Sequence, residues 1–123
     1  MDGVLTLVTA AQALQDACHS ASVKAGWWRD KATGTYIPSD PALLLLHTGW
    51  KLTLVHSEVS ESAEGFRKGL MDDHLPQYPM AAVEIADAII RLCDLAGAHD
   101  FSLGEVLAAV SYTHLTLPTN REV

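Results

Sequence analysis

The sequence is poor in basic residues, and this scarcity limits the partners that the protein can bind. It contains 8 Lys and Arg against 15 Asp and Glu, which gives a formal net charge of −7. Binding to a nucleic-acid backbone requires clustered basic side chains that neutralise its phosphates. We therefore expect no nucleic-acid partner. A polyphosphate ligand is still compatible with the acidic chain if a metal ion lies between the charges.

Cysteines and long apolar segments are also scarce. The two cysteines, Cys18 and Cys93, lie in helical patterns and have no CxxC spacing, so we expect reduced, buried thiols in a cytoplasmic protein with no secretory signal. The apolar run Ala42–Leu46 is far too short to span a bilayer. We therefore expect no membrane partner.

No segment shows a strand pattern above background, whereas apolar residues recur at helical spacing in four segments. We expect helices over about residues 10–25, 41–68 and 79–97, and a fourth from residue 103. The spacing predicts an all-α domain that resembles a four-helix bundle. Asp40 and Pro41 form a favourable helix start, and Gly69 a favourable helix end.

The second and third helices are expected to form most of the core. The third is apolar around most of its circumference, which is typical of a helix surrounded by others. A chain with four short helices has too little of its own surface to cover it, so we expect a homodimer or a larger homo-oligomer. The apolar face predicted for the second helix consists of Leu52, Val55, Val59, Ala63 and Phe66.

The end of the chain changes character abruptly. Residues 110–119, VSYTHLTLPT, resemble the in-frame translation of a transposon-type sequencing adapter, and their Thr and Pro content disfavours helix. We expect a domain over residues 1–109, truncated in its last helix, followed by a non-native tail over residues 110–123. The alternative is a natural irregular tail.

Two pairs of carboxylates stand out, Glu58 with Glu61 and Glu84 with Asp87. Residues three apart on a helix are neighbours, with Cβ atoms roughly 5–6 Å apart, so each pair repels itself unless a cation lies nearby. Glu58 and Glu61 have no basic residue three or four positions away, whereas Arg91 could pair with Asp87. The pairs are either solvated surface acids, the commonest case, or ligands that face one another across two helices.

The residue types indicate which metal such a site would hold. Four carboxylates offer only hard oxygen ligands, which suit Mg²⁺ and, as a second possibility, Mn²⁺. The Glu-x-x-His motifs of di-iron bundles and the HExxH motif of zinc enzymes are both absent from the sequence.

These motifs resemble the MazG-like, all-α nucleoside triphosphate pyrophosphohydrolases, whose signature is EExxE followed by ExxD. HSEVSESAEGFRKG at residues 56–69 contains the ExxE, with Ser57 where the leading glutamate of the family often falls. EIADAIIRLCDLAG at residues 84–97 contains the ExxD, and LQDACHSASVKAGWWRDK at residues 14–31 is similar to the start of phage and bacterial members. The resemblance covers roughly residues 14–109.

The resemblance implies Mg²⁺-dependent hydrolysis of nucleoside triphosphates between the α and β phosphates, giving nucleoside monophosphate and pyrophosphate. It makes Glu58, Glu61, Glu84 and Asp87 the metal ligands, with Glu58 or Glu61 also orienting the attacking water. We add Trp28, Lys51 and Arg67 as candidate substrate-binding residues. The family usually supplies further Lys, Asn and Arg from its last helix, so a chain truncated there is expected to be weakly active.

Two other interpretations remain open. One is a non-catalytic helical interaction module whose acids are merely solvated, and such a module would gain nothing from Mg²⁺. The other is a related all-α pyrophosphohydrolase with a narrower substrate, such as dUTP, dCTP or phosphoribosyl-ATP. The sequence does not indicate the preferred base.

Overall fold

A computed structural model describes residues 2–116 of the 123-residue chain and confirms the all-α prediction for them. Its four α-helices are α1 (Asp2–Lys24), α2 (Pro41–Lys68), α3 (Met80–Ala98) and α4 (Leu103–Thr116), and a 3-10 helix, η1 (Ile37–Ser39), precedes α2. No β-strand forms in this part of the chain. Within the same residues, no helix is both long enough and apolar enough to cross a membrane.

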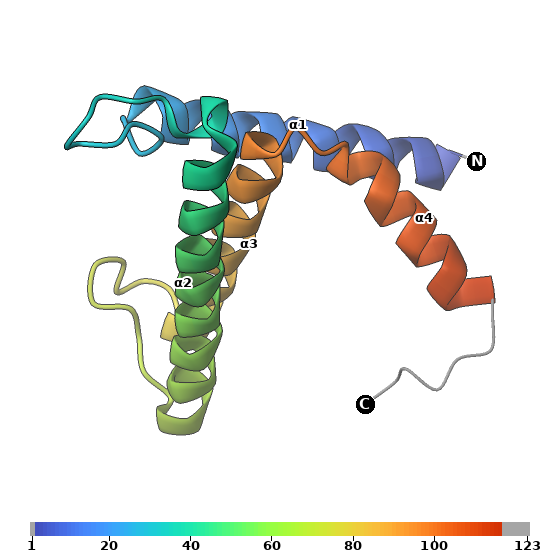
Figure 1. The fold of residues 1–123 in the computed structure, drawn as a ribbon. Helices are drawn as coiled ribbons and strands as arrows, with labels where there is room; N and C mark the ends of the chain where they lie inside the picture. Colours follow the sequence, from blue (N-terminus) through green and yellow to red (C-terminus); the bar gives the residue numbers. More distant parts are fainter. Residues whose placement is uncertain (1, 117–123) are drawn as a thin grey trace.

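Helix α3 packs against both α1 and α2. Helices α2 and α3 run antiparallel, side by side, and α1 crosses the end where α2 begins and α3 finishes (Figure 1). Helix α4 packs along α1 and diverges from the other two helices (Figure 1). The α2–α3 pair with α1 across its end is therefore the part of the fold that can shape a site.

The boundaries of α2 follow the sequence prediction. The backbone N–H of Leu43 donates to Asp40 Oδ1 at 3.1 Å, so Asp40 caps the helix start with Pro41 in the first position. Gly69 adopts a left-handed conformation with φ of 65° and ends the helix, because its N–H donates to the Gly65 carbonyl at 2.8 Å. Helix α3 begins one residue later than predicted, since Pro79 takes the extended conformation of a cap.

Helix α1 begins well before the predicted residue 10, because its first turns pack on α4. The backbones of Val8 and Gly104 approach so closely that a Cβ on Gly104 would collide with the Val8 carbonyl. Gln15, which is 3% exposed, accepts from the N–H of Leu103 at 3.0 Å and donates to the Phe101 carbonyl at 2.6 Å. The contact at Val8 stabilises turns of α1 that local pattern alone did not predict, and Gln15 joins the predicted part of α1 to the start of α4.

Helix α4 continues through residues 110–116 instead of ending near residue 109. Propagation of a formed helix costs each added residue only a few tenths of a kcal/mol in intrinsic propensity, so unfavourable residues at its end are tolerated. Thr113 also donates its hydroxyl to the Ala109 carbonyl at 3.0 Å. The rest of the predicted tail, residues 117–123, lies outside the described residues.

Small residues bring α2 and α3 together. Gly65 lies so close to α3 that a Cβ there would be 2.7 Å from the backbone nitrogen of Ala81, and Ser62 donates to the Ala81 carbonyl at 2.9 Å. At the other end of the pair, Trp28 and Ile37 are each 1% exposed and pack with Leu95. The interface therefore leaves no room for large apolar side chains beside Ser62 and Gly65.

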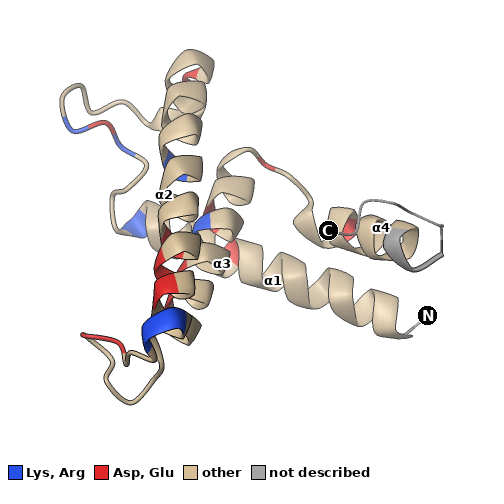
Figure 2. Cartoon of the chain, turned by 90° about the horizontal axis from the view of Figure 1, so that it is seen from below, with Lys and Arg blue, Asp and Glu red and all other residues tan. Residues whose placement is uncertain are grey.

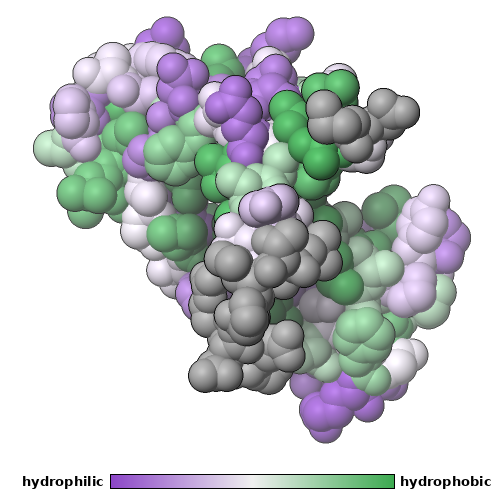
Figure 3. All heavy atoms as spheres, turned by 90° about the vertical axis from the view of Figure 1, so that its right-hand side faces the viewer, coloured by the Kyte–Doolittle hydropathy of each residue, from purple (hydrophilic) through white to green (hydrophobic). Residues whose placement is uncertain are grey.

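The apolar face predicted for α2 is wrong as a core face. Leu52, Val59 and Phe66 are 42%, 57% and 72% exposed, whereas Glu58, Ser62 and Gly65 are buried. Large apolar side chains of α3 are also half exposed, namely Ile85, Ile89, Ile90 and Leu92. Figure 3 shows hydrophobic side chains at the surface in several places. The close helix contact selected the face with small residues, and the described residues leave much of the bulky face exposed.

Candidate metal centre and adjoining cleft

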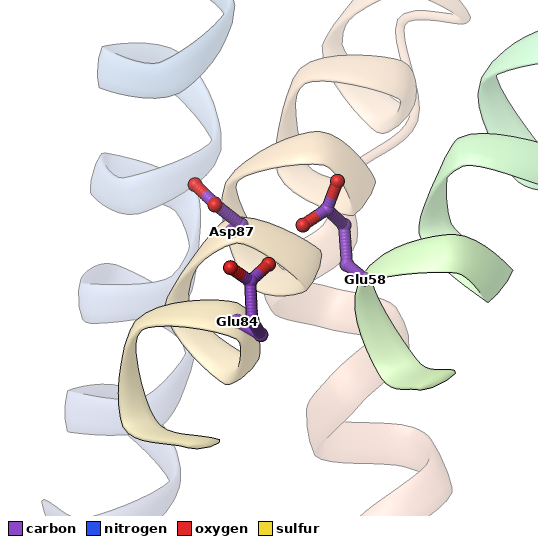
Figure 4. A group of neighbouring side chains, drawn as sticks. All are labelled: Glu58, Glu84 and Asp87. Carbon is purple, nitrogen blue, oxygen red and sulfur yellow. The ribbon is translucent and has the colours of Figure 1, made fainter. Parts of the chain in front are cut away.

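Three of the four predicted ligands meet between α2 and α3. Glu58 on α2 faces Glu84 and Asp87 on α3 (Figure 4), and each offers one carboxylate oxygen within 4.8 Å of the other two. Glu58 is 9% exposed, Glu84 is 8% exposed and Asp87 is partly buried. Figure 2 shows acidic segments side by side on these two helices. We call Glu58, Glu84 and Asp87 the carboxylate cluster.

The fourth predicted ligand, Glu61, is exposed and lies outside this cluster. It is still near enough to Glu84 to contribute to the raised pKa of that carboxyl. Glu61 therefore borders the cluster from the solvent side.

Burial and mutual repulsion raise the pKa values of two carboxyls in the cluster. The pKa of Glu84 is raised to about 8, first by hydrogen bonding to Glu58, then by burial and by the negative charges of Glu58 and Glu61. Burial, followed by the charge of Glu58, also raises the pKa of Asp87. The cluster therefore retains a proton at neutral pH in the absence of another cation.

One buried oxygen of the cluster lacks a partner. Among the described residues, no hydrogen-bond donor reaches Glu84 Oε2, although most buried polar atoms in proteins are paired. An oxygen of this kind, beside two further carboxylates, fits a hard divalent cation such as Mg²⁺ or Mn²⁺. The donor set contains no nitrogen or sulfur ligand that would favour zinc.

Glu58 has a basic partner that its own helix does not provide. The Nε of Arg91, on α3, lies 3.3 Å from Glu58 Oε1. Sequence spacing had suggested Asp87 as the partner of Arg91, and the structure instead forms the ion pair across the two helices. Helical spacing along one chain segment cannot reveal such a pair, because it depends on how α2 and α3 are rotated against each other.

A cleft of about 740 Å³ adjoins the carboxylate cluster and is lined by α1, α2, α3 and the start of the loop after α1. Asp87 belongs both to the cluster and to the cleft wall. The other polar and aromatic lining residues are Ser22, Trp27, Trp50, Lys51, Arg91 and Asp94. Burial is the main cause that lowers the pKa of Lys51. The cleft therefore combines a partly desolvated ammonium, a guanidinium and two indoles beside the carboxylates.

The structure places the predicted substrate-binding residues differently. Lys51 lines the cleft, as the prediction requires. Arg67 lies in the last turn of α2, where it pairs with Glu64 at 2.6 Å, and it does not line the cleft. Trp28 is 1% exposed, so its ring cannot stack on a base, whereas Trp27 is 62% exposed. Sequence reasoning missed Trp50, whose position on α2 gave no signal of a cleft.

Trp28 is held in place by a buried carboxylate of α3. Its Nε1 donates to Asp94 Oδ1 at 2.8 Å, and Nδ1 of His19 lies 2.9 Å from the same oxygen. Lys51 Nζ lies 4.3 Å from the centre of the Trp28 ring, a cation–π distance. The Trp28 ring, fixed by Asp94, therefore supports the Lys51 ammonium from below.

Comparisons of the chain with protein-family models, with curated proteins and with solved structures gave no match. The resemblance to MazG-like enzymes therefore remains a prediction from the two carboxylate motifs and the segment at residues 14–31.

Proposed function

We propose that this protein is a Mg²⁺-dependent nucleoside triphosphate pyrophosphohydrolase that cleaves between the α and β phosphates. The observation that carries this proposal is the position of Asp87, which joins the carboxylate cluster to the cleft. A cation on these carboxylates would lie at the edge of a cavity large enough for a small ligand. The sequence resemblance to MazG-like enzymes points to the same activity.

We assign the following roles to residues of the carboxylate cluster and the cleft. Glu58, Glu84 and Asp87 would hold Mg²⁺, or Mn²⁺ in its place, and the exposed Glu61 would orient the attacking water from the solvent side. When bound there, such a cation would supply charge neutralisation for the phosphates and would lower the pKa of a water molecule. Lys51 and Arg91 bind the phosphates.

Two tryptophan side chains of the cleft are suited to bind the base of the nucleotide. Trp27 and Trp50 are 62% and 61% exposed and both line the cleft. Stacking on an aromatic side chain is worth about 1–3 kcal/mol per base and tolerates different bases. The substrate-binding role that the sequence suggested for Trp28 therefore passes to these two residues, and stacking on them leaves the choice among bases open.

We also propose that the protein acts in the cytoplasm as a homodimer, or a larger homo-oligomer, in which a second copy covers the exposed apolar side chains of α2 and α3. Val59 and Phe66 on α2 are 57% and 72% exposed, and Ile89 on α3 is 44% exposed. Light scattering at micromolar concentration should give a mass of at least two chains. A single-chain mass would contradict this assembly.

A non-catalytic interaction module is the second candidate, and the same exposed apolar side chains favour it. The two candidates differ in their response to divalent cations. An enzyme with this cluster gains thermal stability from Mg²⁺, whereas a module with solvated acids does not.

The test is a screen of all ribonucleoside and deoxyribonucleoside triphosphates for Mg²⁺-dependent pyrophosphate release, with Glu84→Gln as the inactive counterpart. Release that requires Glu84 supports the proposal, and release from a single triphosphate identifies the narrower, base-specific enzyme. The proposed reaction also requires that the wild-type protein bind Mn²⁺ saturably, which calorimetry measures. Absence of such binding in the wild-type protein would rule out the metal centre and with it the proposed reaction.

A further inference from the structure

Arg91 contacts both parts of the candidate site. Its Nε lies 3.3 Å from Glu58 Oε1 in the carboxylate cluster, and its side chain also lines the cleft. The Arg91 side chain is 40% exposed, whereas that of Glu58 is 11% exposed. The guanidinium therefore lies at the boundary between a buried anion and an open cavity.

We propose that the Arg91 side chain has two alternative positions and thereby couples the metal centre to the cleft. In the metal-free protein it neutralises Glu58. When a divalent cation occupies the carboxylate cluster, Arg91 leaves Glu58 and turns into the cleft, where it binds the phosphates of the substrate. This inference rests on the proposed function, because it assumes that the cluster holds a cation.

The exchange follows from charge and geometry. Glu58, Glu84 and Asp87 offer oxygens within 4.8 Å of one another, so a cation that binds all three comes close to the atom that Arg91 contacts. Two positive groups on one carboxylate repel each other. A partly exposed ion pair contributes little to stability, so Arg91 can exchange this partner for another at small cost.

The second position suits a guanidinium. Its planar set of donors matches the oxygens of a phosphate group, which an ammonium cannot do in the same bidentate manner. Asp87 and Arg91 are four residues apart on α3 and both line the cleft, because residues at this spacing share one face of a helix. A short movement of the Arg91 side chain therefore keeps it beside the place where a metal-bound phosphate would lie.

Calorimetric titration with Mn²⁺ alone tests the first position. Arg91→Gln should bind Mn²⁺ about two- to fivefold more tightly than wild type, the range that corresponds to loss of a competing, partly exposed ion pair. Lys51→Gln is the matched control. It removes one positive charge from the same cleft, but the Lys51 ammonium lies over Trp28 and not beside Glu58. The control should retain the wild-type Mn²⁺ affinity.

Titration with an α,β-methylene nucleoside triphosphate at saturating Mn²⁺ tests the second position. Arg91→Gln should bind this analogue more weakly than wild type, so that one substitution strengthens metal binding and weakens nucleotide binding. Arg91→Lys provides a second variant that retains the charge. It should show near-wild-type Mn²⁺ affinity and weakened analogue binding.

The outcomes separate this inference from the proposed function. Equal Mn²⁺ affinity in wild type and Arg91→Gln would overturn the exchange while leaving the metal centre intact. Equal tightening in Arg91→Gln and Lys51→Gln would also overturn it, since a general change of charge would then explain the result. If neither wild type nor Arg91→Gln binds Mn²⁺ saturably, the proposed function fails, and the exchange fails with it.

Discussion

Helix α3 carries two buried carboxylates that differ in their partners, Glu84 and Asp94. Both are 8% exposed. Asp94 Oδ1 accepts a hydrogen bond from Trp28 and lies within hydrogen-bond distance of His19, whereas Glu84 Oε2 has no donor among the described residues. Burial of an acid therefore does not distinguish a structural role from a ligand role in this protein. The hydrogen-bond partners of each acid distinguish the two roles.

The two acids also differ in what they connect. Asp94 joins α3 to His19 of α1 and to Trp28 in the loop that follows it. Glu84 faces Glu58 and Asp87, which are negative like itself. The hydrogen-bonded Asp94 stabilises the fold with protein partners alone. The group of Glu58, Glu84 and Asp87 is stable only when a proton or a cation reduces its repulsion.

The largest expected difference between the two acids is in stability. Asp94→Ala leaves the Trp28 indole N–H buried without an acceptor and removes the contact to His19. Loss of such partners costs about 1–3 kcal/mol each, so we expect the free energy of unfolding to fall by roughly 2–4 kcal/mol in urea denaturation. Glu84→Gln, the matched control without metal, should lose nothing, and an equal loss in both variants would contradict the distinction.

The same pair should show the opposite difference in metal binding. Glu84→Gln removes a proposed ligand and relieves repulsion with Glu58, so Mn²⁺ affinity should fall at least about tenfold while the metal-free protein becomes no less stable. Calorimetric Mn²⁺ titration and thermal unfolding at matched pH measure the two effects. Wild-type Mn²⁺ affinity in Glu84→Gln would show that Glu84 is not a ligand.

The raised pKa of Glu84 predicts how pH acts on the site. This pKa is about 8 in the folded protein against 4.5 for an ordinary glutamate, so protonated Glu84 favours the folded state. Its contribution to the stability of the metal-free protein is complete below about pH 4.5 and is lost as pH rises to about 8. Over the same interval Mn²⁺ affinity should rise, because the cation must displace the proton.

Calorimetry at pH 7 in buffers with different ionisation enthalpies measures the protons released when Mn²⁺ binds. We expect a release approaching one proton per site from the wild-type protein. A Mn²⁺ affinity that does not change between pH 5.5 and pH 8 would contradict the assignment of this proton to the cluster.

The smallest expected effect concerns Glu61, which borders the cluster from solvent. Glu61→Gln should lower Mn²⁺ affinity by about two- to threefold, in line with the small energies of exposed charge interactions, and should not destabilise the metal-free protein. Its effect on pyrophosphate release should exceed its effect on Mn²⁺ affinity, because its proposed role is to orient water. A loss of Mn²⁺ affinity as large as that in Glu84→Gln would make Glu61 a full ligand.

The sequence by itself determined the all-α class, the two ends of α2 and the pairing of acids along α2 and α3. These features depend on residues close together in the chain. Asp40 and Pro41 define a helix start, Gly69 permits the left-handed residue that ends it, and a three-residue step places two side chains on one helix face. Local stereochemistry is sufficient for each.

Only the tertiary structure decided which of these side chains are buried and what they contact. Gly65 and Ser62 let α2 approach α3 closely, so Glu58 lies in the interface and Val59 at the surface. The ion pair of Arg91 with Glu58 and the hydrogen bond of Trp28 to Asp94 depend on the same packing. Hydrophobic burial has no preferred direction, so the apolar periodicity of α2 predicted one face as buried, and the close fit of backbone to backbone at Gly65 buried another.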